Sequence, residues 1–294
     1  MRKDLKNMKN FSDYKADAHT WITLSSGEYY PDILQDACEL YKPVLVLFGQ
    51  LMKSSESSIQ LFLNISDVAD GWMRIQLARV FRKYVSPETP VEMLKKKTKA
   101  REICEQFGKG FRPIHQVQKA FSIRPIPDEA ICALLWEYKD RGKKGYDLTE
   151  KFFNLFRQIF PDLVIIGPER AGRDILMKEV FADYPNPNRP IDFVIKTGET
   201  VLAIGLARYD GDRGGSQEDD RTGGYSNCAN EFLTYANSKN ISTKIIFLND
   251  GPGLLLGSMW NDYANLEQSW QGEIMVLTLR MIAQRLTTDW LSSK

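Results

Sequence analysis

Two apolar segments joined by a short turn constrain the fold of this chain more than any other feature. Residues 191–196 and 200–209 are rich in β-branched and apolar side chains, and Thr197-Gly198-Glu199 lies between them, which is typical of a β-hairpin. A helical pattern at 226–238 and a buried-strand pattern at 244–248 follow. This order predicts an α/β fold (α+β, with a mixed sheet) whose sheet is flanked by helices.

The first half of the chain carries helical patterns instead. Ser66 is expected to cap one helix, and Thr89-Pro90-Val91-Glu92 has the form of a capping box with proline at the first helical position. Asp128 is expected to open another helix, since an acidic residue suits the positive end of the helix dipole. These signals predict that the region before the hairpin is helical.

A glycine-rich basic segment at residues 141–145 interrupts the helical pattern. We therefore expect two domains, a helical and basic region over residues 1–145 and a sheet-containing domain over residues 146–294. Within the second domain, the patterns predict helices at 148–160 and again near 274–286.

Composition excludes several classes of protein. The four cysteines among 294 residues show no CxxC spacing, which argues against a zinc ribbon or a disulfide scaffold and fits a reducing, cytoplasmic location. The longest apolar run, Ala130 to Trp136, is far shorter than a membrane span, so we expect no membrane partner. Only His19 and His115 could serve a histidine-dependent triad or metal site.

The net charge of +1 conceals a strong asymmetry. Residues 74–144 contain 17 Lys and Arg against eight Asp and Glu, a net +9 that leaves about −8 for the remainder. A basic block beside an acidic one suits a polyanionic partner. The alternative is an ordinary solvated helical surface, and the charge run alone does not separate the two interpretations.

The hairpin region resembles the core of PD-(D/E)xK nucleases. Asp192 stands near the start of the first strand, in Asp192-Phe193-Val194-Ile195-Lys196, and the second strand reads Val201 to Tyr209. A glycine-rich polar loop, a helix and the run Ile246 to Gly251 follow, in an order similar to the type II restriction endonucleases that cut at GATC. The similarity covers residues 150–253, roughly a third of the chain.

This resemblance implies a magnesium-dependent site. In the family, an aspartate on the first strand and a carboxylate on the second bind Mg²⁺, so Asp192 and the main-chain carbonyl of Leu206 are implied ligands. The second carboxylate of the motif falls at Gly205, and the motif lysine falls at Ala207. In such folds the helix before the core often provides a further acidic group near the metal, and Glu150 lies on this helix.

Glycine at position 205 leaves three alternatives. The chain could be a variant engineered from Glu to Gly to abolish a toxic activity. The acidic ligand could have moved to the next helix, to Glu218, Asp219 or Glu231. The resemblance could also be false, because a glycine inside a strand more often marks a bulge or a close approach.

The polar segment after the second strand is the expected DNA-reading element. Arginine can donate two hydrogen bonds to guanine or to phosphate, and glutamine can form a similar pair with adenine. Aspartate can hold an arginine in place or accept a hydrogen bond from cytosine. The alternative is a solvent loop with weak local ion pairs. The residues expected to contact DNA are Arg208, Tyr209, Asp210, Asp212, Arg213, Gln217 and Arg221, together with Lys95 and Lys97 of the basic region.

The resemblance implies a type II site-specific deoxyribonuclease of a bacterial restriction-modification system, which hydrolyses double-stranded DNA with Mg²⁺ and acts as a homodimer. Because Gly205 stands in place of the family's acidic residue, we expect this chain to cut DNA poorly or not at all. Residues 1–145 would then serve recognition or dimerisation, and residues 146–294 would be the nuclease domain. Gly205 favours an alternative, a nuclease-fold DNA-binding module without catalysis. A helical protein–protein adaptor with a degenerate α/β domain is the third possibility.

Overall fold

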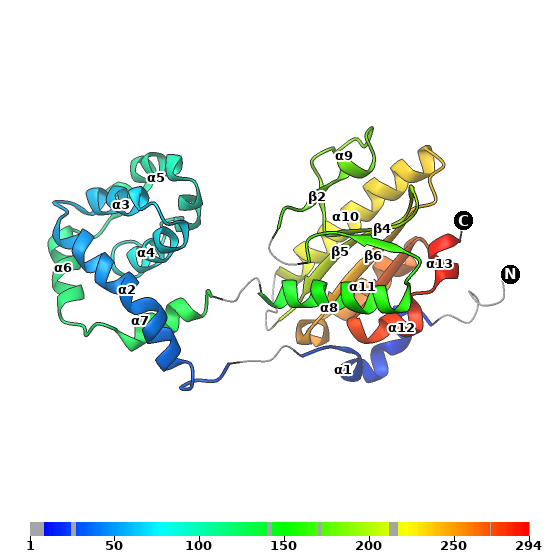
Figure 1. The fold of residues 1–294 in the computed structure, drawn as a ribbon, viewed down its shortest axis with the longest axis horizontal. Coiled ribbons are helices and arrows are strands. Elements are labelled where there is room, and N and C mark those ends of the chain that lie inside the picture. Colours follow the sequence, from blue (N-terminus) through cyan, green and yellow to red (C-terminus); the bar gives the residue numbers. More distant parts are fainter. Residues whose placement is uncertain are drawn as a thin grey trace. The chain divides into compact units, whose positions relative to one another are not determined.

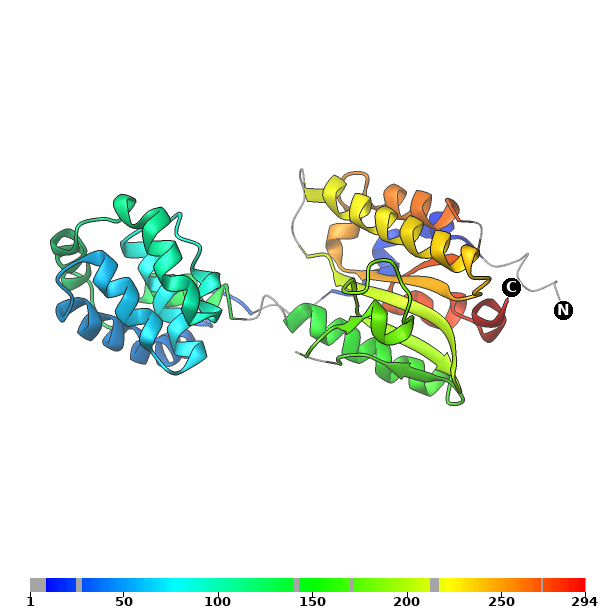
Figure 2. The same ribbon diagram turned by 90° about the horizontal axis from the view of Figure 1, so that it is seen from above.

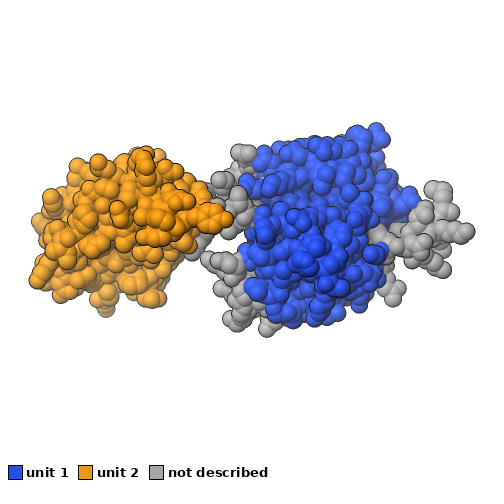
Figure 3. Space-filling model, turned by 90° about the horizontal axis from the view of Figure 1, so that it is seen from below, with its two compact units in different colours: residues 1–26, 142–294 blue, residues 27–141 orange. Residues whose placement is uncertain are grey.

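The computed structural model describes residues 9–24, 28–139, 143–169, 172–211, 217–270 and 272–293, and the side chains of 143–146 and 217–222 lie outside this description. The chain forms two compact units (Figure 3). Residues 27–141 form the helical unit, and residues 1–26 with 142–294 form the sheet unit. No helix within the described ranges is both long and apolar enough to span a membrane.

The sheet unit is built on a five-stranded mixed sheet, so the α/β expectation is confirmed (Figure 1). The strand order is β1-β4-β5-β6-β7, with β1, β4 and β5 antiparallel and β5, β6 and β7 parallel. The strands are β1 (Val164–Ile166), β4 (Phe193–Thr197), β5 (Thr200–Tyr209), β6 (Lys244–Asp250) and β7 (Ile274–Leu277). A separate two-stranded sheet pairs β2 (Ile175–Leu176) with β3 (Pro190–Ile191).

The expected hairpin is present as β4 and β5. Gly198 has a φ of +54° in the turn between them, a conformation that glycine adopts without a steric penalty. In Figure 2, helix α8 (Lys143–Ile159) lies on one side of the sheet, and α10 (Gln217–Ser238) and α11 (Met259–Gln268) lie on the other. Phe152 of α8 packs on Phe193 of β4, and Tyr225 of α10 stacks on Phe247 of β6.

Short elements complete the sheet unit. They are η2 (Phe11–Asp17), α1 (Ala18–Trp21), α9 (Met177–Val180), η6 (Pro252–Leu255), η7 (Leu279–Met281), α12 (Ile282–Arg285) and α13 (Thr288–Ser292). A helix was expected near residues 274–286; this was wrong for residues 274–277, whereas η7 and α12 are short helices within the range. A short unbroken apolar run suits a buried strand as well as a helix, and pairing with β6 makes residues 274–277 a strand.

The N-terminal segment belongs to the sheet unit rather than to the helical region. Phe11 and Tyr14 are buried in its core, and the Phe11 ring stacks on Trp260 with centroids 4.4 Å apart. The helical unit is therefore an insertion between the N-terminal segment and α8. The division expected at residue 145 lies close to the C-terminal end of this insertion, but it assigned residues 1–26 to the other side.

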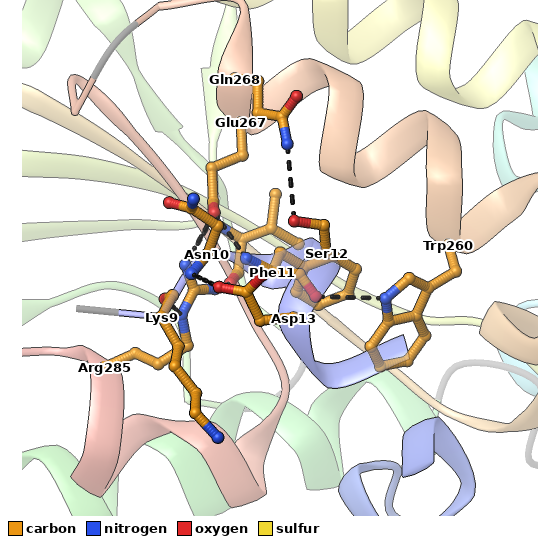
Figure 4. Close-up of polar contacts among 10 residues, drawn as sticks. Lys9, Asn10, Phe11, Ser12, Asp13, Trp260, Glu267, Gln268 and Arg285 are labelled. Atoms are coloured by element: carbon orange, nitrogen blue, oxygen red, sulfur yellow. Dashed lines mark hydrogen bonds and ion pairs between the residues drawn. The ribbon is translucent and has the colours of Figure 1, made fainter. Parts of the chain in front are cut away.

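A buried ion pair connects this segment to the C-terminal elements (Figure 4). Arg285 Nη2 donates to both carboxylate oxygens of Glu267, at 2.7 and 2.8 Å. Glu267 also accepts from the main-chain N–H groups of Phe11 and Val276, and Arg285 donates to the carbonyl oxygens of Lys9 and Val276. One pair thus joins the N-terminal segment, α11, β7 and α12.

The helical unit has a separate core, in which Phe62 contacts both Phe81 and Phe111. Its elements are α2 (Leu34–Lys53), α3 (Ser58–Asp67), α4 (Gly71–Tyr84), η3 (Val91–Lys95), η4 (Lys97–Lys99), α5 (Ala100–Phe107), η5 (Gly108–Gly110), α6 (Ile114–Ser122) and α7 (Glu129–Trp136). The Asp128 cap is confirmed, since its Oδ1 accepts from the N–H groups of Ala130 and Ile131.

Two other helix starts were predicted wrongly. Ser66 lies in the last turn of α3, and Asp70 caps α4 by accepting from Met73 N at 2.6 Å. Serine and aspartate are both good N-caps, so the local sequence did not choose between them. The capping box precedes two short 3₁₀ helices rather than a long α-helix, and the α-helix begins only at Ala100; the buried Arg74 side chain donates to the Leu94 carbonyl in this segment.

We predict that Glu267→Gln lowers the free energy of unfolding of the sheet unit by roughly 3–5 kcal/mol, because it leaves the Arg285 charge buried without its partner. The control is Glu169→Gln, which breaks an ion pair with Arg157 whose side chains are 44% and 46% exposed. That change should cost less than about 1 kcal/mol. Urea unfolding measures both, and equal losses would contradict the role given to the buried pair.

Candidate metal and nucleic-acid site

Asp192 lies between β3 and β4, directly against β5. Its main-chain N–H donates to the Gly205 carbonyl at 3.0 Å, although Phe193 is the register partner of Gly205. This hydrogen bond places Asp192 beside Gly205, immediately before the paired part of β4. The Asp192 Oδ2 atom accepts from the Ala207 N–H at 2.7 Å. This bond fixes the carboxylate beside residues 205–207 of β5.

The surroundings of Asp192 disfavour its ionised form. Burial raises the pKa of its carboxyl to about 6, the N–H of Ala207 opposes this rise, and the negative charge of Asp174 adds to it. Asp174 is an exposed residue immediately before β2. The Asp174 charge thus acts on the Asp192 carboxyl, and a divalent cation bound at Asp192 would relieve this repulsion.

Gly205 is a packing requirement of this fold. A Cβ atom at position 205 would lie 1.9 Å from Cζ of Phe193 and 2.5 Å or less from two further atoms of the same ring. Phe193 is fully buried, and its ring centroid lies 4.9 Å from that of Phe152. The place of the motif carboxylate is therefore filled by an aromatic ring of the core.

The neighbouring motif positions contribute main-chain groups. Ala207 supplies the N–H that holds Asp192, and its methyl group has no acid–base chemistry. Leu206 lies between Gly205 and Ala207 on β5 and is half-buried. Glu150 is a half-buried residue of α8, one turn before Phe153.

Glu231, one alternative source of the missing carboxylate, is engaged elsewhere. Arg189 donates to it from Nε at 3.1 Å and from Nη2, and this guanidinium holds the pKa of the Glu231 carboxyl below its usual range against the opposing effect of burial. The side chains of Glu218 and Asp219 lie outside the described residues. Glu231 is thus a structural partner of Arg189.

Arg208, Tyr209 and Asp210 form the end of β5 and the residue after it. Arg208 Nε lies 3.0 Å from Oδ1 of Asp210, whose side chain is 1% exposed, whereas the Arg208 side chain is 37% exposed. The Tyr209 hydroxyl donates to the Thr23 carbonyl at 3.1 Å. In this arrangement Asp210 holds the arginine, Tyr209 anchors the N-terminal segment, and Arg208 reaches the surface.

The remaining residues expected to contact DNA are placed only in part. Asp212 and Arg213 lie outside the described residues, and Gln217 and Arg221 belong to α10 with side chains outside the description. The helix begins at Gln217, well before the predicted start at 226. Lys95 and Lys97 belong to the helical unit, where the Lys95 side chain is 73% exposed and Lys97 Nζ donates to the Asp67 carbonyl at 3.3 Å.

Sequence reasoning missed two residues of this region. Asp174 was missed because nothing in its local pattern connects it to Asp192. Asn249 is the register partner of Arg208 on β6, and it is fully buried with no hydrogen-bond partner for either amide atom among the described residues. Its place at the carboxyl end of a predicted strand is the signal that could have identified it.

The described residues contain no group of three or more His, Cys, Asp or Glu side chains placed to hold a metal ion. Comparison with protein-family models gave no match, and neither a curated protein nor a solved structure matches the chain. Asp192, Asp174 and Arg208 are therefore the residues that define the candidate site.

We predict that Gly205→Ala lowers the free energy of unfolding by about 1–3 kcal/mol or more, because the added methyl group overlaps the Phe193 ring. Gly224→Ala is the control, since its Cβ would meet nothing within 4 Å on α10. That change should raise stability by roughly 0.5–1 kcal/mol. Thermal and urea unfolding report both, and a neutral Gly205→Ala variant would refute the packing requirement.

We further predict a pH dependence that Asp192 causes. Its pKa of about 6 in the folded protein exceeds the value of about 4 in an unfolded chain, so the folded state binds the extra proton. The contribution of Asp192 to stability is therefore largest below about pH 4 and falls as the pH rises through 6. Asp192→Asn should remove this fall, and Mg²⁺ should stabilise the wild type more at pH 8 than at pH 5. Melting curves against pH, with and without Mg²⁺, provide the test.

Proposed function

We propose that the chain is a nuclease of the PD-(D/E)xK type that acts on double-stranded DNA with Mg²⁺. The order of elements supports this proposal: a helix, three antiparallel strands, a second helix and a parallel strand, which are α8, β1, β4, β5, α10 and β6. These elements cover the part of the chain that resembles restriction endonucleases of the GATC-cutting family.

The observation that carries the proposal is the position of Asp192. Its carboxylate is held by the Ala207 N–H, next to Leu206 and within the influence of Asp174. Carboxylate and carbonyl oxygens suit Mg²⁺, which usually keeps several waters and needs only one or two carboxylates from the protein. Asp192, Asp174 and the Leu206 carbonyl are the donors we assign. Bound Mg²⁺ would polarise the scissile phosphate and lower the pKa of a ligand water.

The residues of the chain set up this chemistry in separate ways. The Ala207 N–H orients the Asp192 carboxylate, which becomes a ligand as it ionises above about pH 6. Arg208, held by Asp210, is placed to neutralise a phosphate oxygen of the DNA backbone. Lys95 and Lys97 offer further phosphate contacts from the helical unit.

The wider context follows from the same resemblance. A restriction enzyme that reads a palindromic site acts as a symmetric dimer, because a two-fold axis in the protein matches the two-fold axis of the site. We therefore propose a homodimer of a bacterial restriction-modification system. The polar segment that includes Arg213, Gln217 and Arg221 is our candidate for base recognition.

A second candidate function is DNA binding without cleavage. Gly205 and the Phe193 ring favour it, because the position of the second motif carboxylate is closed to any side chain. A site with Asp192 and an exposed Asp174 has fewer fixed ligands than the motif normally provides. Catalysis would then be lost, while Lys95, Lys97 and Arg208 would still bind DNA.

Plasmid digestion over a Mg²⁺ titration tests both candidates. We expect the wild type to cut DNA only slowly, and Asp192→Asn and Asp174→Asn each to lower this rate by roughly 100-fold or more. Asp162→Asn, which alters an exposed aspartate after α8, is the matched control and should not change the rate. DNA affinity should weaken steeply with salt, with a log–log slope of roughly −0.9 for each neutralised phosphate.

The outcomes separate the candidates. Salt-dependent DNA binding without any cutting by the wild type would favour the second candidate. The absence of salt-dependent binding would contradict both and leave a protein–protein adaptor. Cutting that survives both aspartate substitutions would show that the metal ligands lie elsewhere, and Glu218 would be the next residue to change.

A further inference from the structure

Helix α6 of the helical unit has one buried face and one exposed face, and it lies at the edge of the unit in Figure 1. Val117 and Phe121 are buried, and the Phe121 ring packs on Phe48 with ring centroids 5.4 Å apart. Residues three and four apart share one side of a helix, so the opposite side forms a continuous exposed stripe. This stripe, the α6 face, consists of His115, Gln116, Lys119, Ser122 and the C-cap residue Ile123, which is 75% exposed.

The α6 face lies in a part of the chain that has no acidic residue. Residues 109–127 contain four Lys or Arg and no Asp or Glu. Arg124 is paired with Asp128 at 2.7 Å, but the structure, over the residues it describes, gives no ion pair or side-chain hydrogen bond to Lys109, Arg112 or Lys119. A protein surface usually mixes charges of both signs, so this region stands out as uniformly positive.

Other cations of the helical unit are neutralised within the protein. Arg79 pairs with Glu92 at 2.8 Å, and Lys99 pairs with Glu102 at 2.6 Å. An ion pair of this kind has to be broken before the cation can serve a partner molecule. The Lys119 ammonium carries no such cost, and it therefore marks the α6 face as the better surface for an anionic partner.

The segment before α6 is held firmly by the core of the unit. The main-chain N–H of Arg112 donates to the Val85 carbonyl at 3.1 Å, and the Ser58 hydroxyl donates to the Arg112 carbonyl at 2.5 Å. Gln118 of α6 also donates to the Met52 carbonyl at 3.3 Å. A helix fixed in this way presents its exposed side chains at defined positions, which recognition of a partner requires.

The side chains of the α6 face match the chemistry of base edges. The major groove of B-DNA admits an α-helix, lysine donates to guanine there, glutamine pairs with adenine, and apolar groups contact the thymine methyl. Gln116, Lys119 and Ile123 follow one another at spacings of three and four along one stripe. Lysine is depleted in protein–protein interfaces, which favours DNA over a protein partner.

We propose that the α6 face docks in the major groove of double-stranded DNA and reads its sequence. Gln116 and Lys119 contact base edges, Ile123 packs on a thymine methyl, and Lys109 and Arg112 bind phosphates beside the groove. The proposal rests on the proposed function, since it takes the same double-stranded DNA as partner. It adds a second reading element to the polar segment after β5.

The test uses full-length protein and a library of DNA duplexes with a randomised segment, in EDTA to prevent cutting. The wild type should select a preferred sequence. Gln116→Ala and Lys119→Ala should each lose discrimination at one base pair, by roughly 10-fold or more. Lys109→Ala should instead weaken binding to all sequences about equally and lower the salt slope by about 1.

Gln50→Ala and Lys42→Ala are the matched controls, because both residues are exposed on α2 and lie outside the α6 face. Both should keep the wild-type preference. Acetylation of lysines in the wild type, mapped by mass spectrometry, needs no variant and so does not depend on the folding of one. Bound DNA should protect Lys119 and Lys109 from acetylation and leave Lys42 unchanged.

The outcomes separate this proposal from the proposed function. If DNA binds in a salt-dependent way but both variants of the α6 face keep the wild-type preference, or if Lys119 is acetylated equally with and without DNA, the role of α6 is overturned and the proposed function stands. Absence of DNA binding by the wild type would contradict both. Protection of Lys119 by a rise in protein concentration alone would overturn the proposal by assigning the α6 face to contact between copies of the chain.

Discussion

The sheet unit depends on the buried ion pair between Glu267 and Arg285. The sheet unit is discontinuous in sequence, because the helical unit is inserted after the N-terminal segment. A contact is therefore needed between that segment and the C-terminal elements, which are far away along the chain. The pair provides it through main-chain groups of Lys9, Phe11 and Val276. Buried charges are stable only when paired and fully hydrogen-bonded, and here the pairing partners are also the connections that the unit needs.

The candidate site depends on a second constraint, the contact between Phe193 and Gly205. The ring lies over the glycine, so β4 and β5 approach closely, and Asp192 stands beside Phe193 opposite the same residue. The Ala207 N–H then holds the aspartate carboxylate. The contact between Phe193 and Gly205 therefore has two effects: it leaves no room for a side chain at position 205, and it helps to position Asp192. A glycine at 205 is explained by packing, whatever its history.

The helical unit is organised separately, with its own aromatic core. Its two ends are tied within the unit by the packing of α2 on α7 and by the contact between Trp136 and Glu28. Because these contacts join its first and last parts, the helical unit can keep its fold independently of the sheet unit. This suits a region that we propose to contact DNA.

The sequence by itself determined the class of the fold and the hairpin that carries Asp192, because alternating and β-branched patterns identify strands locally, and Asp128 identified a helix start for the same local reason. It wrongly predicted a helix where β7 lies, since a short apolar run becomes a strand only when β6 pairs with it. The effect of the Asp174 charge on Asp192, the Phe193 ring in the space beside Gly205, and the partners of Glu231 and Asp210 were decided by tertiary structure alone. Each of these effects involves residues that are not related by any local sequence pattern. Desolvation and close packing act on such residues only after folding has brought them together.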